Sequence, residues 1–454
     1  MKNKFWGLLS VLLLVATFLP ACTPGVIKAP ANIKPIVFVH GFAGSAAQFE
    51  SQAMRFESNG YPANYISAYE YDSGAGLSPK FPPASVLDGV DQVVDAALKN
   101  TGADKVDLIG HSLGTKVSQA YLTSSPERAA KIAHYVNIDG MAGTELPGGV
   151  PTLALWAGRR PPEFLTAGEI VGATNVTLPS VTHVECATCP EAFVEMFKFL
   201  TGQAPVTDKI VAEPSANIDL AGRAVIFPQN IGVQQSGAAL EIWEIDSQTG
   251  ARIGNQPQVT YPIGGTGDWG PFKAKAGVNY EFTLVRETLV VHFYFEPFIR
   301  SDYLIRLNTE IPGKGMGSHM DTSDRQSNMY ISRNKEFWGD QGAESDVLAI
   351  NGTNICTGAI CPLNKLVVAI FVYDNGADGK TDLTAPVTYF YTTVAFFISG
   401  ADLFIPATNP PAGTISMILT PRGGGGKTQV INVPNWVSIK DRISVQFNDF
   451  LQAE

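Results

Sequence analysis

Residues 106–114 read VDLIGHSLG, an apolar run that leads directly into a serine flanked by glycines. A strand, a tight turn and a following helix in this order are typical of a nucleophile elbow, which exposes a serine hydroxyl at a sheet edge. Gly110 and Gly114 lack side chains where the turn crowds its neighbours, so Ser112 can adopt a strained backbone conformation. The stretch therefore predicts an α/β sheet with Ser112 as its nucleophile.

The segments around this motif alternate between strand-like and helix-like patterns from about residue 33 to residue 202. Such alternation predicts a parallel sheet with helices on both faces, which we place in a catalytic domain at residues 22–204. Apolar runs predict strands at 36–39, 64–69, 105–109, 133–138, 152–156 and 175–178, and helical patterns predict helices at 49–59, 86–99, 113–123 and 191–200.

The character of the sequence changes after Gly202, where a polar linker with prolines begins. Residues 239–245 and 280–285 alternate between apolar and polar side chains, which predicts a small antiparallel β-sandwich at 215–287. Further strand-like segments predict a β-rich C-terminal domain at 288–454. The aromatic cluster at 293–295 is interpreted as sandwich core; the alternative is an apolar surface for lipid or polymer.

The N-terminus carries features of an export signal. Two lysines precede an apolar stretch at residues 5–19, and residues 1–21 are therefore predicted to be a signal peptide. The alternative is a membrane-spanning helix, but such a helix requires about 20 apolar residues, and the stretch at 5–19 is shorter. The sequence LPAC at 19–22 resembles the lipobox of bacterial lipoproteins, although Pro20 departs from the usual small residue. We expect a lipid on Cys22, and thus an outer-membrane or cell-surface lipoprotein, or otherwise a secreted protein.

The remaining cysteines form two close pairs. In an oxidising compartment, Cys186 with Cys189 and Cys356 with Cys361 are expected to form disulfides that close short loops. The competing interpretation is a zinc site, because His183 precedes the first pair at a ligand-like spacing.

Composition limits the classes of partner. The 454 residues are 45% hydrophobic and 16% charged, with a net charge of -10. No basic cluster is present, which argues against a nucleic-acid partner. A chain of this length also exceeds what a single core supports, in agreement with several domains.

A nucleophilic serine requires a base. His183 follows the last predicted strand of the first domain and precedes its closing helix, so a loop at the carboxyl edge of the sheet would bring it to Ser112. Its rivals are less suitable, because His40 and His111 lie inside glycine-containing motifs and His134 lies within a strand.

The orienting acid is expected at the same edge of the sheet. Asp139 ends the strand at 133–138, and parallel strands present their carboxyl ends together. Glu163 follows the next strand and is the alternative, although two arginines and two prolines separate it from that strand. We therefore predict Asp139 as the acid.

An oxyanion hole is predicted beside the serine. Residues 40–43 read HGFA after the first strand and resemble the His-Gly motif of lipases. The backbone N–H groups of Phe42 and Leu113 would then bind the negative oxygen of a tetrahedral intermediate.

Together these motifs resemble the lipases and esterases of the α/β-hydrolase fold, and more closely two-domain lipases of the archaeal alkaline type with a β-rich C-terminal half. The resemblance implies a serine carboxylic-ester hydrolase that acts on lipid esters, without metal or organic cofactor. A hydrolase of polyesters or polyhydroxyalkanoate, with the β-rich half as a binding module, is the runner-up. A surface-anchored binding protein with a decayed hydrolase fold is the alternative outside enzymes.

Overall fold

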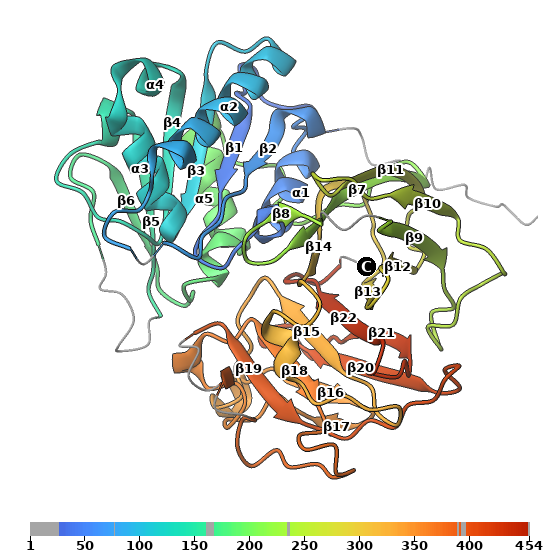
Figure 1. Ribbon diagram of the computed structural model, residues 1–454. Helices are drawn as coiled ribbons and strands as arrows, with labels where there is room; N and C mark the ends of the chain where they lie inside the picture. Colours follow the sequence, from blue (N-terminus) through green and yellow to red (C-terminus); the bar gives the residue numbers. More distant parts are fainter. Residues whose placement is uncertain are drawn as a thin grey trace, which may run out of the picture.

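The computed structural model describes residues 27–76, 78–159, 168–233, 237–387, 390–391 and 396–452. An α/β domain at the N-terminal end of this range lies against two β-rich parts (Figure 1). We call residues 215–312 the middle unit and residues 315–452 the C-terminal unit.

The α/β domain contains a six-stranded sheet in which every neighbouring pair is parallel. Its order is β2-β1-β3-β4-β5-β6. All residues of β1, β3 and β5 are buried, as expected for strands that are covered on both faces. The strands are β1 (Ile36–Val39), β2 (Ile66–Tyr69), β3 (Val106–His111), β4 (Ile132–Ile138), β5 (Thr152–Ala157) and β6 (Thr174–Leu178).

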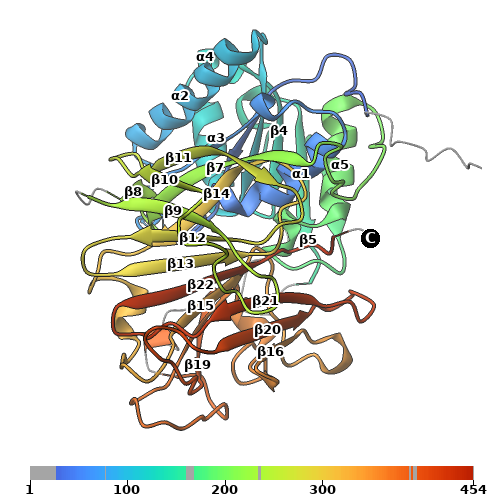
Figure 2. The same ribbon diagram turned by 90° about the vertical axis from the view of Figure 1, so that its right-hand side faces the viewer.

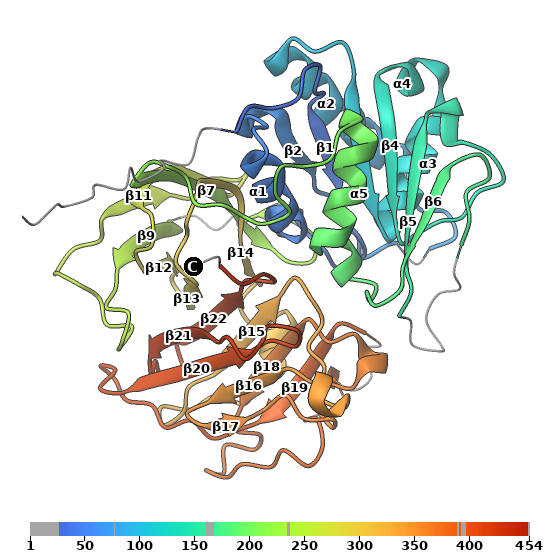
Figure 3. The ribbon, with the colours of Figure 1, turned by 180° about the vertical axis from the view of Figure 1, so that it is seen from behind.

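Helices cover both faces of this sheet because the side chains of each strand alternate between them. Ile36 and Phe38 pack with α1 and α5, whereas Val37 and Val39 pack with α2 and α3. Figure 3 shows α1 and α5 on one face of the sheet. The helices are α1 (Glu50–Ser58), α2 (Ala84–Thr101), α3 (Leu113–Ser124), α4 (Pro126–Ala130) and α5 (Pro190–Thr201). The predicted α/β fold class is confirmed.

The middle unit is a sandwich of two layers. One layer has the order β11-β7-β14, and β8 pairs with β7; β9, β10, β12 and β13 supply the other. Side chains of both layers form one hydrophobic core. The strands are β7 (Asn217–Ile226), β8 (Ile231–Gly232), β9 (Ala239–Glu244), β10 (Val259–Pro262), β11 (Asp268–Lys275), β12 (Tyr280–Val285), β13 (Val290–Phe295) and β14 (Asp302–Thr309).

The strand pairing of this sandwich extends beyond residue 287, where we placed its end. β13 pairs with β12, and β14 pairs with β7 in parallel, so the unit reaches Thr309. Sequence alternation within β13 cannot reveal which sheet the strand joins. Phe293, Tyr294 and Phe295 are all buried, which agrees with their interpretation as core residues.

The two β-rich units share one eight-stranded sheet, with the order β10-β9-β12-β13-β22-β15-β18-β19. The last strand of the chain, β22 (Asp441–Phe447), lies between β13 and β15 and is parallel to both (Figure 2). The middle and C-terminal units are therefore continuous through backbone hydrogen bonds. The other strands that the C-terminal unit adds to this sheet are β15 (Met329–Arg333), β18 (Ala369–Tyr373) and β19 (Ile398–Asp402).

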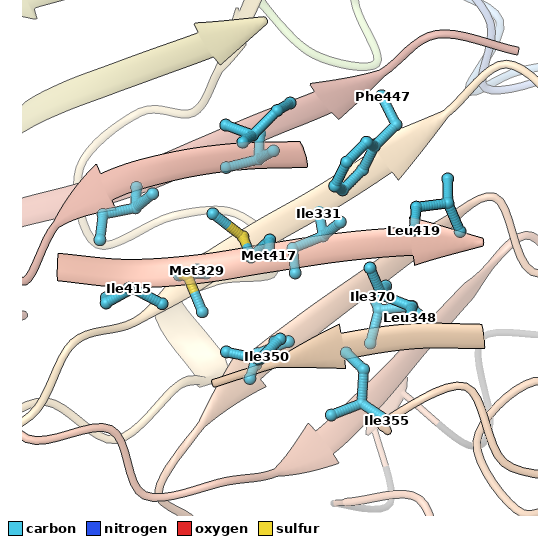
Figure 4. Packing of buried hydrophobic residues seen from close by; sticks show 14 of the residues in the cluster. Met329, Ile331, Leu348, Ile350, Ile355, Ile370, Ile415, Met417, Leu419 and Phe447 are labelled. Atoms are coloured by element: carbon cyan, nitrogen blue, oxygen red, sulfur yellow. The ribbon is translucent and has the colours of Figure 1, made fainter. Parts of the chain in front are cut away.

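A four-stranded sheet of order β17-β16-β20-β21 completes the C-terminal unit. Figure 4 shows the apolar side chains of the C-terminal unit's core, among them Met329, Leu348, Met417 and Phe447. The strands are β16 (Val347–Ile350), β17 (Thr353–Asn354), β20 (Thr414–Thr420) and β21 (Gln429–Pro434). Short 3₁₀ helices are η1 (Ala46–Phe49), η2 (Ala63–Tyr65), η3 (Pro147–Gly149), η4 (Glu185–Ala187), η5 (Met316–His319), η6 (Gly342–Glu344) and η7 (Leu363–Lys365).

The expected disulfides are not formed: within the described part of the chain, neither cysteine pair is joined by a bond between its sulfurs. Cys189 instead lies at the N-terminus of α5, where its sulfur accepts the N–H of Ala192 at 3.5 Å. Burial raises the pKa of Cys189 to about 12. Burial and a hydrogen bond with Cys356 raise the pKa of Cys361. Close spacing in the sequence was therefore not sufficient to predict a covalent link.

No helix in the described ranges combines the length and the apolar character needed to cross a membrane. The predicted signal peptide and Cys22 lie outside those ranges.

Candidate active site

Ser112 occupies the sharp turn between β3 and α3. Its φ of 52° and ψ of -120° are strained values for a residue with a side chain. The turn lies so close to β1 that a Cβ atom on Gly114 would be 2.1 Å from the carbonyl oxygen of Val39. Only glycine fits there, which explains the spacing of the motif. The N–H of Ser112 donates to the carbonyl of Ile138 on the neighbouring strand at 3.0 Å.

His183 lies in the loop between β6 and η4 and faces Ser112. Its Nε2 is 2.9 Å from Ser112 Oγ, and its Nδ1 is 2.7 Å from Asp139 Oδ2. The imidazole is buried, with 3% of the residue exposed. With the Asp139 carboxylate as acceptor, Nδ1 carries the proton and Nε2 accepts the serine hydroxyl.

Asp139 follows β4 directly and has a positive φ of 44°, which turns its side chain toward the histidine. Its second carboxylate oxygen accepts the N–H of Ala157 at 2.8 Å, and its own N–H donates to Leu155 at 2.8 Å. The residue is 1% exposed. Backbone groups of β5 thus fix the carboxylate. Glu163, the alternative acid, lies outside the described residues.

The other histidines of this domain have different surroundings. His111 Nε2 donates to the carbonyl of His183 at 2.9 Å, and burial lowers the pKa of His111 to about 3, so its imidazole is neutral. His134 Nδ1 lies 2.8 Å from the buried carboxylate of Asp107. His40 stacks on the ring of Tyr71. None of these three rings bonds Ser112.

The loop after β1 passes beside the serine, where the oxyanion hole was predicted. A Cβ atom on Gly41 would lie 3.0 Å from Ser112 Cβ, so the backbone must approach without a side chain. The N–H groups of Phe42 and Leu113 have no hydrogen-bond partner among the described residues. The loop is held by Ser73 Oγ, which accepts the N–H of Ala43 at 2.9 Å.

A cavity of about 220 Å³ opens above Ser112 and is lined by all three parts of the molecule. The α/β domain contributes the loop at 41–48 together with the residues of the serine and histidine loops. The two β-rich units contribute most of the apolar wall: Phe227, Pro228, Met316, Tyr330, Val368, Ala369, Phe396, Phe397 and Ile398. The β-rich half therefore covers the serine.

Two further polar contacts to this site come from the β-rich half, and the sequence analysis missed both. Asn230 has a φ of 57°, and its amide nitrogen lies 3.2 Å from His40 Nε2 and 2.8 Å from the carbonyl of Gly44. Glu336 Oε1 accepts the N–H of Val184 at 2.7 Å. Neither residue lies in a recognisable motif, so no local signal could have identified them.

The zinc interpretation does not fit the geometry of His183, because each ring nitrogen already faces a triad partner. Over the part of the chain that the structure describes, no group of three or more His, Cys, Asp or Glu side chains is arranged to hold a metal ion.

Comparison with known protein families agrees with this architecture. The class 2 lipase family matches residues 33–129, and the lipase C-terminal domain family matches residues 216–312. A third family, described as a C-terminal domain, matches residues 315–451.

Similar solved structures include three proteins that resemble about two fifths of this chain. Lipase B of Aspergillus fumigatus is 14% identical, with a TM-score of 0.29 over 40% of this chain and 57% of that one. A Listeria innocua gene product is 12% identical, with a TM-score of 0.30 over 40% and 98%. Carboxylesterase CesB of Bacillus subtilis is 13% identical, with a TM-score of 0.27 over 39% and 86%. The chain thus spans little more than half of the Aspergillus lipase.

The matched family segments coincide with the parts of the molecule already described. The class 2 lipase segment contains the HGFA loop and the serine elbow, and the lipase C-terminal segment ends just after β14. The N-terminal α/β domain is therefore similar to class 2 lipases, and the middle unit is similar to lipase C-terminal domains.

Proposed function

We propose that the protein is an exported serine hydrolase that cleaves lipid esters through an acyl-enzyme intermediate. The observation that carries this proposal is the chain of hydrogen bonds from Ser112 through His183 to Asp139, at 2.9 Å and 2.7 Å. This arrangement has the nucleophile, the base and the orienting acid that serine catalysis requires.

In the proposed reaction, His183 Nε2 takes the hydroxyl proton while Ser112 Oγ attacks the ester carbonyl carbon. The oxygen becomes negative and binds the N–H groups of Phe42 and Leu113. Asp139 stabilises the imidazolium. His183 then donates its proton to the leaving alcohol, and the acyl group remains on Ser112. Water, activated by His183, hydrolyses this acyl-enzyme and releases the carboxylic acid.

The walls of the cavity support a lipid as substrate. Apolar side chains such as Phe227, Met316 and Val368 surround the space beside Ser112. An acyl chain that packs against them is removed from water. This burial stabilises the complex by about 0.8 kcal/mol for each methylene group.

Export and membrane attachment are part of the proposal. They rest on the signal-like residues 1–21 and on the lipobox-like sequence that ends in Cys22. The mass of the N-terminal peptide of the mature protein tests this point. A diacylglyceryl modification on Cys22 that is lost in Cys22→Ser is the expected result, whereas an unmodified N-terminus would argue for secretion.

The activity is tested by combining active-site labelling with a substrate series. A fluorophosphonate probe should label the wild-type protein and not Ser112→Ala. Rates on p-nitrophenyl esters of rising chain length, measured beside triglyceride emulsions and polyester films, then identify the substrate class. Preference for long acyl chains supports the proposal, and preference for polymer films would favour the polyester alternative. Absence of labelling in the folded wild-type protein would overturn it.

A further inference from the structure

The loop that carries His183 is held from two sides. On the side of the α/β domain, His111 Nε2 donates to the carbonyl of His183 at 2.9 Å, and the N–H of Arg159 donates to Val181 at 3.0 Å. The other side is occupied by the C-terminal unit. The only carboxylate of that unit that accepts hydrogen bonds from the described part of this loop is Glu336.

Glu336 accepts hydrogen bonds from the residues on both sides of His183. Its Oε1 accepts the N–H of Val184 at 2.7 Å, and its Oε2 accepts the hydroxyl of Thr182 at 2.6 Å and the N–H of Glu185 at 3.2 Å. Glu336 is fully buried, so these donors replace water around the carboxylate.

The backbone of Glu336 is itself fixed. The next residue, Phe337, is fully buried in the core of the C-terminal unit, and its N–H donates to Val367 at 2.7 Å. The guanidinium groups of Arg333 and Arg422 both donate to the carbonyl oxygen of Glu336. The carboxylate is therefore presented to the histidine loop from a rigid support.

Ion pairs of Glu185, the residue after Val184, also attach the histidine loop to the C-terminal unit. Glu185 pairs with Lys335 at 2.5 Å and with Arg422 at 3.1 Å. Burial opposes the charged form of Glu185, but these two cations lower its pKa to about 2. Two consecutive residues of the C-terminal unit, Lys335 and Glu336, thus both bind the segment that leads from His183 into η4.

We infer that Glu336 is a positioning residue that holds His183 in line with Ser112, so that the C-terminal unit completes the catalytic geometry as well as covering the cavity. This inference rests on the proposed serine hydrolysis. Its consequence is that the unit matters even for small, soluble esters that need no acyl pocket. A shift of about 1 Å in a catalytic group can cost about 100-fold in rate, and three hydrogen bonds control that shift here.

The experiment uses the full chain with Glu336→Ala and the nearly isosteric Glu336→Gln. Glutamine keeps one oxygen for Val184 but presents an amide group to Thr182 and Glu185. We expect kcat for a short, soluble ester to fall about 100-fold in the alanine variant and about tenfold in the glutamine variant, with KM unchanged. Labelling by a fluorophosphonate should slow by similar factors.

Glu344→Ala is the matched control. Its carboxylate pairs with Arg159 at 3.0 Å across the same interface, but it is exposed and does not touch the histidine loop. We expect wild-type kcat and labelling from this variant. The thermal unfolding of each variant shows that it is folded.

Wild-type kcat and labelling rates in Glu336→Ala and Glu336→Gln would overturn the inference, as would a loss explained entirely by a smaller folded fraction. If the alanine variant does not fold, the glutamine variant decides. Failure of the proposed function has a different signature, since wild-type protein would then escape labelling or Ser112→Ala would retain hydrolysis.

Discussion

The α/β domain and the β-rich half contribute to the same cavity in different ways. All three members of the hydrogen-bonded triad come from loops of one parallel sheet, within residues 112–183. Most of the apolar wall, and the carboxylate that supports the histidine loop, come from residues more than 40 positions further along the chain. Reactive groups are thus placed by one sheet edge, whereas their surroundings are assembled by contacts between domains.

This division has a physical basis. Parallel strands present their carboxyl ends at one edge, so short loops there bring a serine, an acid and a histidine together. The proposed lipid substrate would need a larger apolar surface than one sheet edge offers. Apolar side chains of the β-rich half line the cavity, and β22 joins its two units into one sheet.

The largest expected effect tests whether the α/β domain alone carries the chemistry. Asp139→Asn should lower kcat about 10⁴-fold, because the amide disfavours the tautomer of His183 that accepts the serine proton. Steady-state kinetics on a short ester measure this change.

Asp107→Asn is the matched control for this variant, because Asp107 is also a buried carboxylate bonded to a histidine, His134, in the same domain. Its kcat should stay close to the wild-type value. Normal activity in Asp139→Asn, with loss in Glu163→Gln, would assign the acid to Glu163 instead.

The second prediction concerns whether the two β-rich units unfold together. Phe447 is 1% exposed at the end of β22 and packs in the core of the C-terminal unit (Figure 4). Phe447→Ala should lower the free energy of unfolding by about 3–5 kcal/mol, since a large buried side chain leaves a cavity. Urea unfolding measures this loss.

Hydrogen exchange on the Phe447→Ala variant distinguishes two units that share one sheet from two units that unfold independently. Amides of β13 and β15 should lose protection together, because β22 pairs with both strands. Val430→Ala, at a position that is 44% exposed, should change the stability by less than about 1 kcal/mol. Full protection of β13 beside an exchanging β15 would contradict the prediction.

The third prediction tests whether the cavity wall contributed by the β-rich half binds the acyl chain of the substrate. Val368 lies on the wall of the cavity, and Val368→Phe reduces the space for an acyl chain. We expect kcat/KM for a long-chain ester to fall tenfold or more, by roughly 1–3 kcal/mol of lost binding, while an acetate ester reacts at the wild-type rate. Val347→Phe, on an exposed position of β16, is the control. Equal losses on both esters would place Val368 outside the acyl site.

The smallest expected effect concerns how the stability of the folded protein depends on pH through buried carboxyl groups at the interface between the two halves. Burial raises the pKa of Glu57 to about 7, despite its pairing with Arg300, and burial raises that of Asp302 to about 6. Both groups bind protons more tightly in the folded protein, so their contribution to stability is complete below about pH 4 and is lost as the pH rises toward 7.

Glu70 behaves in the opposite way at the same interface. Burial opposes its charge, but Arg306 and Arg223 lower its pKa to about 2, so its contribution is present above pH 4.5 and is lost only as the pH falls toward 2. We expect the melting temperature to decrease between pH 4.5 and 7, and less so in Glu57→Gln. A melting temperature that rises steadily over this range would contradict the assignment.

The α/β domain and the β-rich half also differ in how well the sequence predicts them. The central strands β1, β3 and β5 could be predicted because strands covered on both faces are continuous apolar runs. The meeting of Ser112, Asp139 and His183 could be predicted because each residue follows a strand of the same sheet. The roles of these residues stay predictions until the variants are measured.

Other features could not be predicted because they depend on contacts between residues far apart in the chain. Val184 and Glu336 are separated by 152 positions, and His40 and Asn230 by 190. The position of β22 between β13 and β15 is equally invisible in its alternating pattern.

By itself, the sequence determined the α/β fold, the strained serine turn and the candidate triad, because backbone propensity, glycine spacing and strand order act locally. Only the tertiary structure decided which side chains enclose the serine, which carboxylate holds the histidine loop and how the two β-rich units join. Those outcomes depend on which buried polar groups of separate domains form hydrogen bonds and which apolar surfaces pack together. Residues far apart in the chain make these contacts, so the local sequence does not specify them.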